Sequence, residues 1–371
     1  MKRNEISIIG LCSVLLLAAC TDDSDGRQGQ DESIISFETT VPLFQTRGLI
    51  NTNGDMQSEG FGVFAYYTGS EEWTEASSPA PNFMYNQKVE WNDPAWTYTP
   101  VKYWPNDNNP ADVSGATGSV THSYLSFFAY APYKSTGITV LQYQPLISYT
   151  WTNNVNPSSQ SDLLYASQKD CYKTRDDGWG FVSGRVPFHF CHALAAIEFK
   201  VRRKDATGEV ICLTSLSLNS ADTTAVSSSQ ASLNTSGSFN LVTAEWVRTS
   251  LTTSTPTISY LEDSSSSPER HDINSSLISP GIGVTDVTPY YLTNYTPNLL
   301  LMMPQETTVS IPFTLSYTLD GTPKSPSGTI TFTQPTGGWA LAMGKKYTVI
   351  FVIDGGEVES YLLRAKEAEQ W

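Results

Sequence analysis

The sequence is built of short apolar runs that end at turn-forming residues, and this pattern limits the fold more than any other feature. Ser, Thr, Tyr, Val and Gly are abundant, and the chain contains 21 prolines. These residues suit pleated strands and tight turns, and no long apolar repeat of the helical period is present. The sequence therefore predicts an all-β fold.

Several segments of the N-terminal half have strand character. In residues 34–41 the alternation places Ile35, Phe37 and Thr39 on one face of a strand. Residues 60–67 and 124–131 are apolar at successive positions, which predicts strands buried on both faces. Between them, residues 82–91 and 96–98 predict a hairpin around a turn at 92–94.

The C-terminal half continues the pattern. Strands are expected at residues 209–218, 237–242, 309–319, 328–332, 347–353 and 358–363, with 309–319 and 328–332 forming a hairpin. The Ser/Thr-rich residues 249–257 are expected to form a surface loop, and residues 364–369 favour a helix.

A break in the alternation lies between residues 186 and 202. The core positions are even-numbered up to 194 and odd-numbered from 197, so Glu198, Lys200 and Arg202 should point away from the core. Because side chains alternate with a period of two, the strand must bulge here or pass between two packing environments. We therefore expect a domain boundary at 190/191.

The N-terminus predicts export. Lys2 and Arg3 precede an apolar run at residues 8–17, which is followed by Leu-Ala-Ala-Cys ending at Cys20. This arrangement is typical of a secretory signal and is too short for a membrane-spanning helix. It resembles the lipobox of bacterial lipoproteins, in which the peptide is cut before the cysteine and the cysteine carries the lipid. The alternative is an ordinary secreted protein with a chance cysteine at the cut site.

The residues after Cys20 are acidic and polar. Residues 20–33 cannot bury apolar area, so we expect a flexible tether. Its acidic start also resembles the surface-export signal of lipoproteins in some Gram-negative groups, although any soluble tether is free to be acidic.

Charge and cysteine content exclude some classes of protein. The formal net charge of −15 argues against nucleic acid or an anionic membrane surface as a partner. Cys171, Cys191 and Cys212 remain after the signal region and Cys20 are set aside. Three thiols allow one disulfide at most, so the fold must depend on burial and sheet hydrogen bonds.

Several segments together resemble the fimbrillin family (FimA/Mfa-like type V pilins). The matching segments are residues 61–66, 103–105, 127–132, 162–166, 188–195, 301–305 and 344–347. Their order and spacing extend over nearly the whole mature chain, and the lipobox agrees with them.

The resemblance implies two tandem transthyretin-like β-sandwich domains, which would occupy residues 34–190 and 191–371. It also implies that an arginine-specific protease removes the first strand and that a strand from another subunit replaces it. Here the corresponding cut would fall between Arg47 and Gly48, and the released strand would carry Ile35, Phe37 and Val41. Alternatively, Arg47 is an ordinary surface arginine.

The replacing strand would come from the C-terminal region. The candidate donor residues are Tyr347, Val349, Phe351, Val358, Tyr361 and Leu363. They could equally complete their own sheet. The charged residues 364–371 suit a donor strand poorly, so a tip or accessory subunit stays possible beside a repeating stalk subunit.

The sequence offers little that indicates catalysis or a cofactor. His189, Cys191 and His192 lie close together, but on a strand His192 faces away from the other two, which disfavours a zinc site. Asp22, Asp23 and Asp25, like residues 106–108, lack the spacing of a calcium loop. We predict no enzyme, no metal and no cofactor.

Aromatic residues support the main alternative function. The chain has 9 Trp and 19 Tyr, clustered at Trp91, Trp96, Tyr98, Tyr103 and Trp104. An exposed, coplanar pair of rings would indicate a surface lipoprotein that binds glycans or host ligands, whereas buried rings would be structural.

The main hypothesis is an adhesive or structural fimbrial subunit. We expect it at the outer membrane and cell surface, held by a lipid anchor and associated with other pilin subunits, with a surface receptor as a further possible partner.

Overall fold

The computed structural model describes residues 34–41, 52–74, 80–108, 110, 117–151, 160–175, 184–204, 211–220, 230–262, 271–272, 290–291, 299–354 and 357–363. These residues form mostly β-strands, together with the helix α1 (Asn53–Glu59) and the 3-10 helix η3 (Arg248–Ser250). The prediction of an all-β fold is confirmed. Among the described residues, no helix has the length and apolar character needed to cross a bilayer.

A six-stranded antiparallel sheet forms the centre of the N-terminal half, with the order β10-β8-β5-β2-β3-β4. Its strands are β2 (Phe61–Gly69), β3 (Met84–Asn92), β4 (Ala95–Thr97), β5 (Tyr124–Ala131), β8 (Leu164–Cys171) and β10 (Cys191–His192). The sequence predicted β2 and β5 as buried strands, and the hairpin β3–β4 around residues 92–94. All three predictions are confirmed.

Both faces of this sheet are covered. One face packs against β1 (Ser36–Thr40) and β9 (Arg185–His189), which form a two-stranded parallel sheet. We call the apolar layer between them, which includes Phe37, Phe61 and Phe188, the small core. The other face belongs to a larger cluster, the large core, in which Phe64 and Tyr149 take part.

The sheet in the large core joins segments that are distant in sequence. Its strands are β6 (Ile138–Val140), β7 (Leu146–Thr150), β13 (Leu233–Asn240), β14 (Glu245–Trp246) and β15 (Thr252–Ser254). β15 is an exposed strand within the segment expected to be a surface loop. Because β7 pairs with β13, this sheet contains strands from both sides of the predicted boundary at 190/191, and that boundary stays a prediction.

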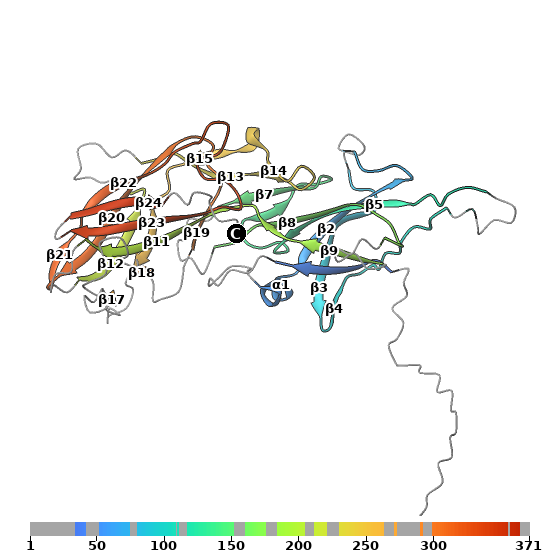
Figure 1. Cartoon of the computed structure of the whole chain (residues 1–371), viewed down its shortest axis with the longest axis horizontal. Coiled ribbons are helices and arrows are strands. Elements are labelled where there is room, and N and C mark those ends of the chain that lie inside the picture. Colours follow the sequence, from blue (N-terminus) through green and yellow to red (C-terminus); the bar gives the residue numbers. More distant parts are fainter. Residues whose placement is uncertain are drawn as a thin grey trace, which may run out of the picture.

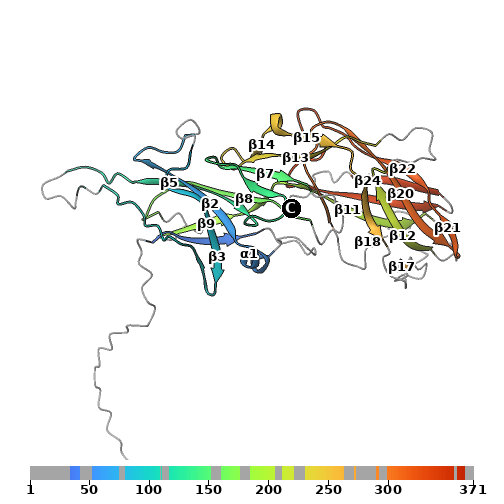
Figure 2. The same ribbon diagram turned by 180° about the vertical axis from the view of Figure 1, so that it is seen from behind.

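Two further sheets pack together at the other end of the molecule (Figure 1). The first contains β11 (Ala195–Arg203), β18 (Tyr290–Tyr291), β19 (Leu299–Met302), β23 (Lys346–Asp354) and β24 (Glu357–Leu363). The second contains β12 (Ile211–Leu218), β16 (Ile258–Glu262), β17 (His271–Asp272), β20 (Val309–Leu319), β21 (Thr322–Lys324) and β22 (Ser327–Phe332). The ring centroids of Phe313 and Phe351 lie 4.9 Å apart between these two sheets. Figure 2 shows the same arrangement of the sheets from behind.

The break in alternation at residues 193–196 is where the chain moves between cores. β9, β10 and β11 follow one another closely but belong to three different sheets. Phe190 lies in the small core and Leu194 in the large core. The predicted passage between two packing environments is therefore confirmed.

Alternation predicted the face of Glu198 in β11 correctly, but it did not predict the burial of this side chain. Glu198 lies on the opposite face from Phe199, but it is buried and not solvated. Its carboxylate accepts a hydrogen bond from the Thr348 hydroxyl at 2.9 Å and pairs with Lys200 Nζ at 3.2 Å. The pairing of β11 with β23 supplies Thr348, a partner that alternation within β11 cannot predict.

Candidate functional site: the first strand and its surroundings

The first strand, β1, is held mainly along one edge. It pairs in parallel with β9 in an unbroken register from Ser36 opposite Arg185 to Thr40 opposite His189. Past the end of this ladder, the Phe190 N–H donates to the Thr40 carbonyl at 2.9 Å. Loss of β1 would therefore expose the polar backbone edge of β9, which is a ready template for another strand.

At its N-terminal end β1 gains one contact from the chain that follows β4 and one from the residue that precedes β9. The Ile35 N–H donates to the Lys102 carbonyl at 3.0 Å. The Gly184 carbonyl accepts the Ser36 N–H at 3.0 Å and the Trp104 indole N–H at 3.2 Å. Trp104 thus fixes the same carbonyl that holds β1, a role that sequence reasoning missed.

The inward face of β1 is apolar, as the alternation predicts. Ile35, Phe37 and Thr39 are buried, and Phe37 is 5% exposed. Its ring lies 5.5 Å from Tyr98, 5.5 Å from Phe188, 5.9 Å from Phe61 and 6.0 Å from Phe127, between centroids. Burial of such a side chain stabilises by about 1.5–3 kcal/mol before ring contacts are counted.

The outward face of β1 contributes less. Glu38 pairs with Arg185 across 3.4 Å, and both side chains are about half exposed. Exposed ion pairs of this kind are worth roughly 0–1 kcal/mol. The small core therefore holds β1, and its surface charges do not.

Tyr98 holds the start of β1 through a hydrogen bond. Its hydroxyl donates a hydrogen bond of 2.7 Å to the Ile35 carbonyl. Burial raises the pKa of Tyr98 from 10.0 to about 12, and hydrogen bonding to Lys102 opposes that shift. The neutral phenol is thus the form that the folded site favours.

This shift predicts that the site weakens in alkali. A tyrosine whose folded pKa is raised contributes stability that is complete below pH 10 and is lost as the pH rises towards 12. The contribution is up to about 3 kcal/mol, since one pKa unit corresponds to about 1.4 kcal/mol. We expect urea titrations at pH 8, 10, 11 and 12 to show a stability advantage over Tyr98→Phe that shrinks across this window.

The Tyr98→Phe protein is the control because other buried tyrosines also titrate there, among them Tyr66, whose pKa burial raises to about 12. Only the difference between the two proteins reports on Tyr98. Stability curves that stay parallel from pH 8 to 12 would contradict the prediction.

Some of the other predicted site residues lie among the described residues and some lie outside them. Cys20, Arg47 and Gly48 lie outside the described residues, so the lipidation and cleavage predictions stay predictions. Val41 is half-buried and packs against the small core. The described chain resumes at Thr52, which caps α1 by accepting the Asp55 N–H at 3.1 Å.

The candidate donor residues lie on two strands in different positions. β23 is a central strand between β11 and β24, with Val349 and Phe351 fully buried and Tyr347 half-buried. β24 pairs only with β23 in the described sheet, through a ladder that places Tyr361 opposite Ile350 and Leu363 opposite Thr348. Val358 is half-buried against the large core. The edge position makes β24 the strand that detaches with less disruption.

The tryptophan cluster is structural. Trp96, Tyr98 and Trp104 are buried in the small core, and Trp91 meets Trp96 at an angle of 74°. Tyr103 is exposed beside Ile34. Since no coplanar exposed pair forms here, the glycan-binding interpretation of this cluster is wrong.

The histidines and cysteines do not converge either. His189 and Cys191 are exposed and His192 is buried, as the alternation predicts. His192 Nδ1 lies 2.9 Å from Asp162 Oδ2. In the described part of the chain, no three His, Cys, Asp or Glu side chains lie close enough together to hold a metal ion. Cys171 is buried, and the side chain of Cys212 is outside the description.

Comparison with known proteins agrees with the fold. The fimbrillin-like family matches residues 46–361. The chain is 29% identical over 231 residues to the fimbrium subunit Fim1C of Phocaeicola vulgatus, and the alignment covers 59% of this chain and 57% of that protein's length. A crystal structure of a fimbrial protein from Bacteroides vulgatus superposes with a TM-score of 0.61 at 18% identity, covering 89% of this chain and 98% of that one. The chain therefore belongs to the fimbrillin-like family.

Proposed function

We propose that this chain is a structural, adhesive subunit of a surface fimbrium and has no enzymatic role. It is exported as a lipoprotein through Cys20, and it assembles with other pilin subunits by strand exchange after cleavage between Arg47 and Gly48. Membership of the family and the similarity to a fimbrium subunit support the first part.

The proposed assembly step is supported by the contacts that hold β1 in the protein. Its inward side chains fill the small core, while its backbone ladder runs along β9. A cut after Arg47 would separate β1 from the rest of the chain, since all of β1 precedes that residue. The vacated site would present apolar positions and the free edge of β9, and an added strand satisfies both.

We propose β24 as the first candidate for the added strand. Its removal leaves β23 paired with β11, whereas removal of β23 would divide the sheet. Tyr361 and Leu363 supply alternate apolar side chains of the kind that Ile35 and Phe37 supply in β1.

The test uses the chain from residue 20 to 371 with Cys20→Ser, treated with a trace of arginine-specific protease. We expect mass spectrometry to locate one early cut after Arg47 and native gels to show detergent-resistant ladders. Arg47→Ala is the matched control and should remain uncut and monomeric. A chain that resists cleavage at Arg47 would overturn this route of strand release.

A competition experiment identifies the donor. A synthetic peptide of residues 357–363 should suppress the ladders, and a scrambled peptide of the same composition should not. Suppression by a peptide of residues 346–354 instead would assign the donor to β23.

A further inference from the structure

An exposed pair of tyrosines lies on the face of the N-terminal half away from the small core. Tyr85 in β3 is 42% exposed, and Tyr143 in the turn between β6 and β7 is 67% exposed. Their ring centroids are 6.2 Å apart and their planes differ by 31°. Two distant segments of the chain therefore present aromatic faces side by side.

Hydrogen bonds fix this pair in place. The Tyr143 backbone N–H donates to the Tyr85 hydroxyl oxygen at 2.9 Å, and the Tyr85 hydroxyl donates to the Leu141 carbonyl at 3.4 Å. Beneath them, the Phe64 ring meets Tyr85 edge-on at 5.6 Å. Tyr143 has a φ of 62°, a left-handed conformation that side-chain-bearing residues adopt only when their surroundings impose it. The platform is preorganised, which reduces the entropy cost of binding.

Polar groups suited to hydroxyl-rich ligands surround the rings. Gln142 and Gln144 flank Tyr143 and are both exposed. Each amide carries donors and acceptors, and both kinds are needed to bind neighbouring hydroxyl groups.

A short path of aromatic rings leads from the tyrosine pair to two lysines. Phe64 lies 6.3 Å from Tyr130, and Tyr130 lies 6.2 Å from the half-buried Tyr133. Gly62 allows this path, because a Cβ there would meet the Tyr130 ring at 2.3 Å. Phe64 and Tyr130 are fully buried, so this path runs beneath the surface and links only its two ends, the exposed Tyr85 and the half-buried Tyr133.

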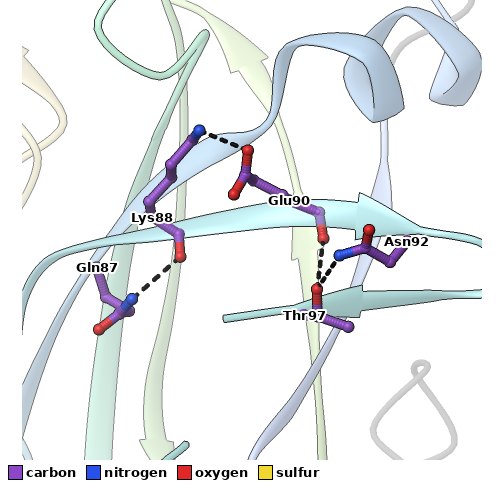
Figure 3. A network of polar contacts seen from close by, with 5 residues as sticks. All are labelled: Gln87, Lys88, Glu90, Asn92 and Thr97. Atoms are coloured by element: carbon purple, nitrogen blue, oxygen red, sulfur yellow. Dashed lines mark hydrogen bonds and ion pairs between the residues drawn. The ribbon is translucent and has the colours of Figure 1, made fainter. Parts of the chain in front are cut away.

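The lysines bring positive charge to an acidic protein. Lys88 Nζ and Lys134 Nζ lie 5.6 and 5.1 Å from the Tyr133 ring centroid. Figure 3 shows Lys88 and Glu90 on the same side of β3, joined by an ion pair, with Gln87 on the other side. Lys88 and Lys134 outnumber Glu90, in a chain whose net charge is −15.

We propose that this surface, comprising Tyr85, Tyr143, Gln142, Gln144, Lys88 and Lys134, binds an acidic glycan. A sugar ring stacks its C–H face on the tyrosines, the glutamines bind its hydroxyls, and a carboxylate or sulfate group meets the lysines. A protein partner fits less well. Among the described residues, the large exposed apolar side chains here are only Tyr85, Leu141 and Tyr143, whereas a stable protein interface buries about 800 Å² per partner.

The test measures sugar binding by the uncut chain from residue 20 with Cys20→Ser, so it does not depend on cleavage or assembly. The probes are 3′-sialyllactose and its neutral parent lactose, titrated by NMR. We expect saturable binding of the acidic sugar, about tenfold weaker binding of lactose, and at least about tenfold weaker binding of 3′-sialyllactose to Tyr143→Ala.

Two further variants separate the contributions. Tyr67→Ala removes a tyrosine near the end of β2 that is as exposed as Tyr85, and this variant should bind like the parent protein. Lys134→Gln should lower the affinity for 3′-sialyllactose to that for lactose. Failure of both sugars to bind, or binding that Tyr143→Ala leaves unchanged, would overturn the proposal. If neither sugar binds and Tyr143→Ala weakens contacts between chains, the surface is a protein interface instead.

Discussion

Phe37→Ala is expected to lower the free energy of unfolding of the first-strand site by about 3–5 kcal/mol, the usual cost of removing a buried phenylalanine. The loss should lie at the upper end because four aromatic rings surround the Phe37 ring within 6.0 Å. β1 has only five residues, so no other position in it can replace this contact.

Hydrogen–deuterium exchange provides the local measurement. The amides of residues 185–190 other than Pro187, among them the Phe190 N–H bonded to Thr40, should lose protection in Phe37→Ala. Urea denaturation followed by tryptophan fluorescence gives the global value, since Trp104 lies in the same small core.

Glu38→Ala is the matched control in the same strand. It removes an exposed ion pair with Arg185, and the expected loss is at most about 1 kcal/mol. If the two variants lost the same stability, the small core would not be what holds β1, and the basis for strand exchange at this site would be removed.

Asp162→Ala is expected to destabilise the chain by about 1–3 kcal/mol, because it removes a buried carboxylate and the contact that His192 Nδ1 makes with it. Asp162 Oδ2 lies 2.9 Å from His192 Nδ1, and the two side chains are 2% and 0% exposed. The pair connects Asp162, which precedes Leu163, with His192 in β10. After β10 the chain leaves the six-stranded sheet and enters β11. Its loss should therefore disturb the contact between the small and large cores.

An exposed pair provides the comparison. Asp354 and Lys204 are 2.7 Å apart with both side chains about half exposed, so Asp354→Ala should cost at most about 1 kcal/mol. Thermal and urea unfolding of both variants gives the two values. Equal losses would mean that burial adds nothing to the Asp162–His192 interaction.

The sequence by itself determined the local features of this protein. Alternation identified the inward residues Ile35 and Phe37, and the turn at 92–94 identified the hairpin β3–β4. The change of alternation at 193–196 indicated a bulge or a passage between two packing environments, and the fold shows the passage. Each of these signals depends only on the two-residue period of a strand or on the chemistry of a turn, so neighbouring residues contain all the information. The signals at Cys20 and Arg47 are also local, and they lie outside the described residues.

The tertiary structure decided which distant segments meet. Pairing of β1 with β9 brings Ser36 to Gly184 across 148 residues, and pairing of β11 with β23 buries Glu198 beside Thr348. The same kind of long-range packing buried Trp96 and Trp104, and it exposed the tyrosine pair formed by Tyr85 and Tyr143. The period of a strand specifies which of its faces is apolar, but it contains no information about the strand or loop that will cover that face. Partner choice depends on the fit of whole surfaces, and those surfaces exist only after the chain has folded.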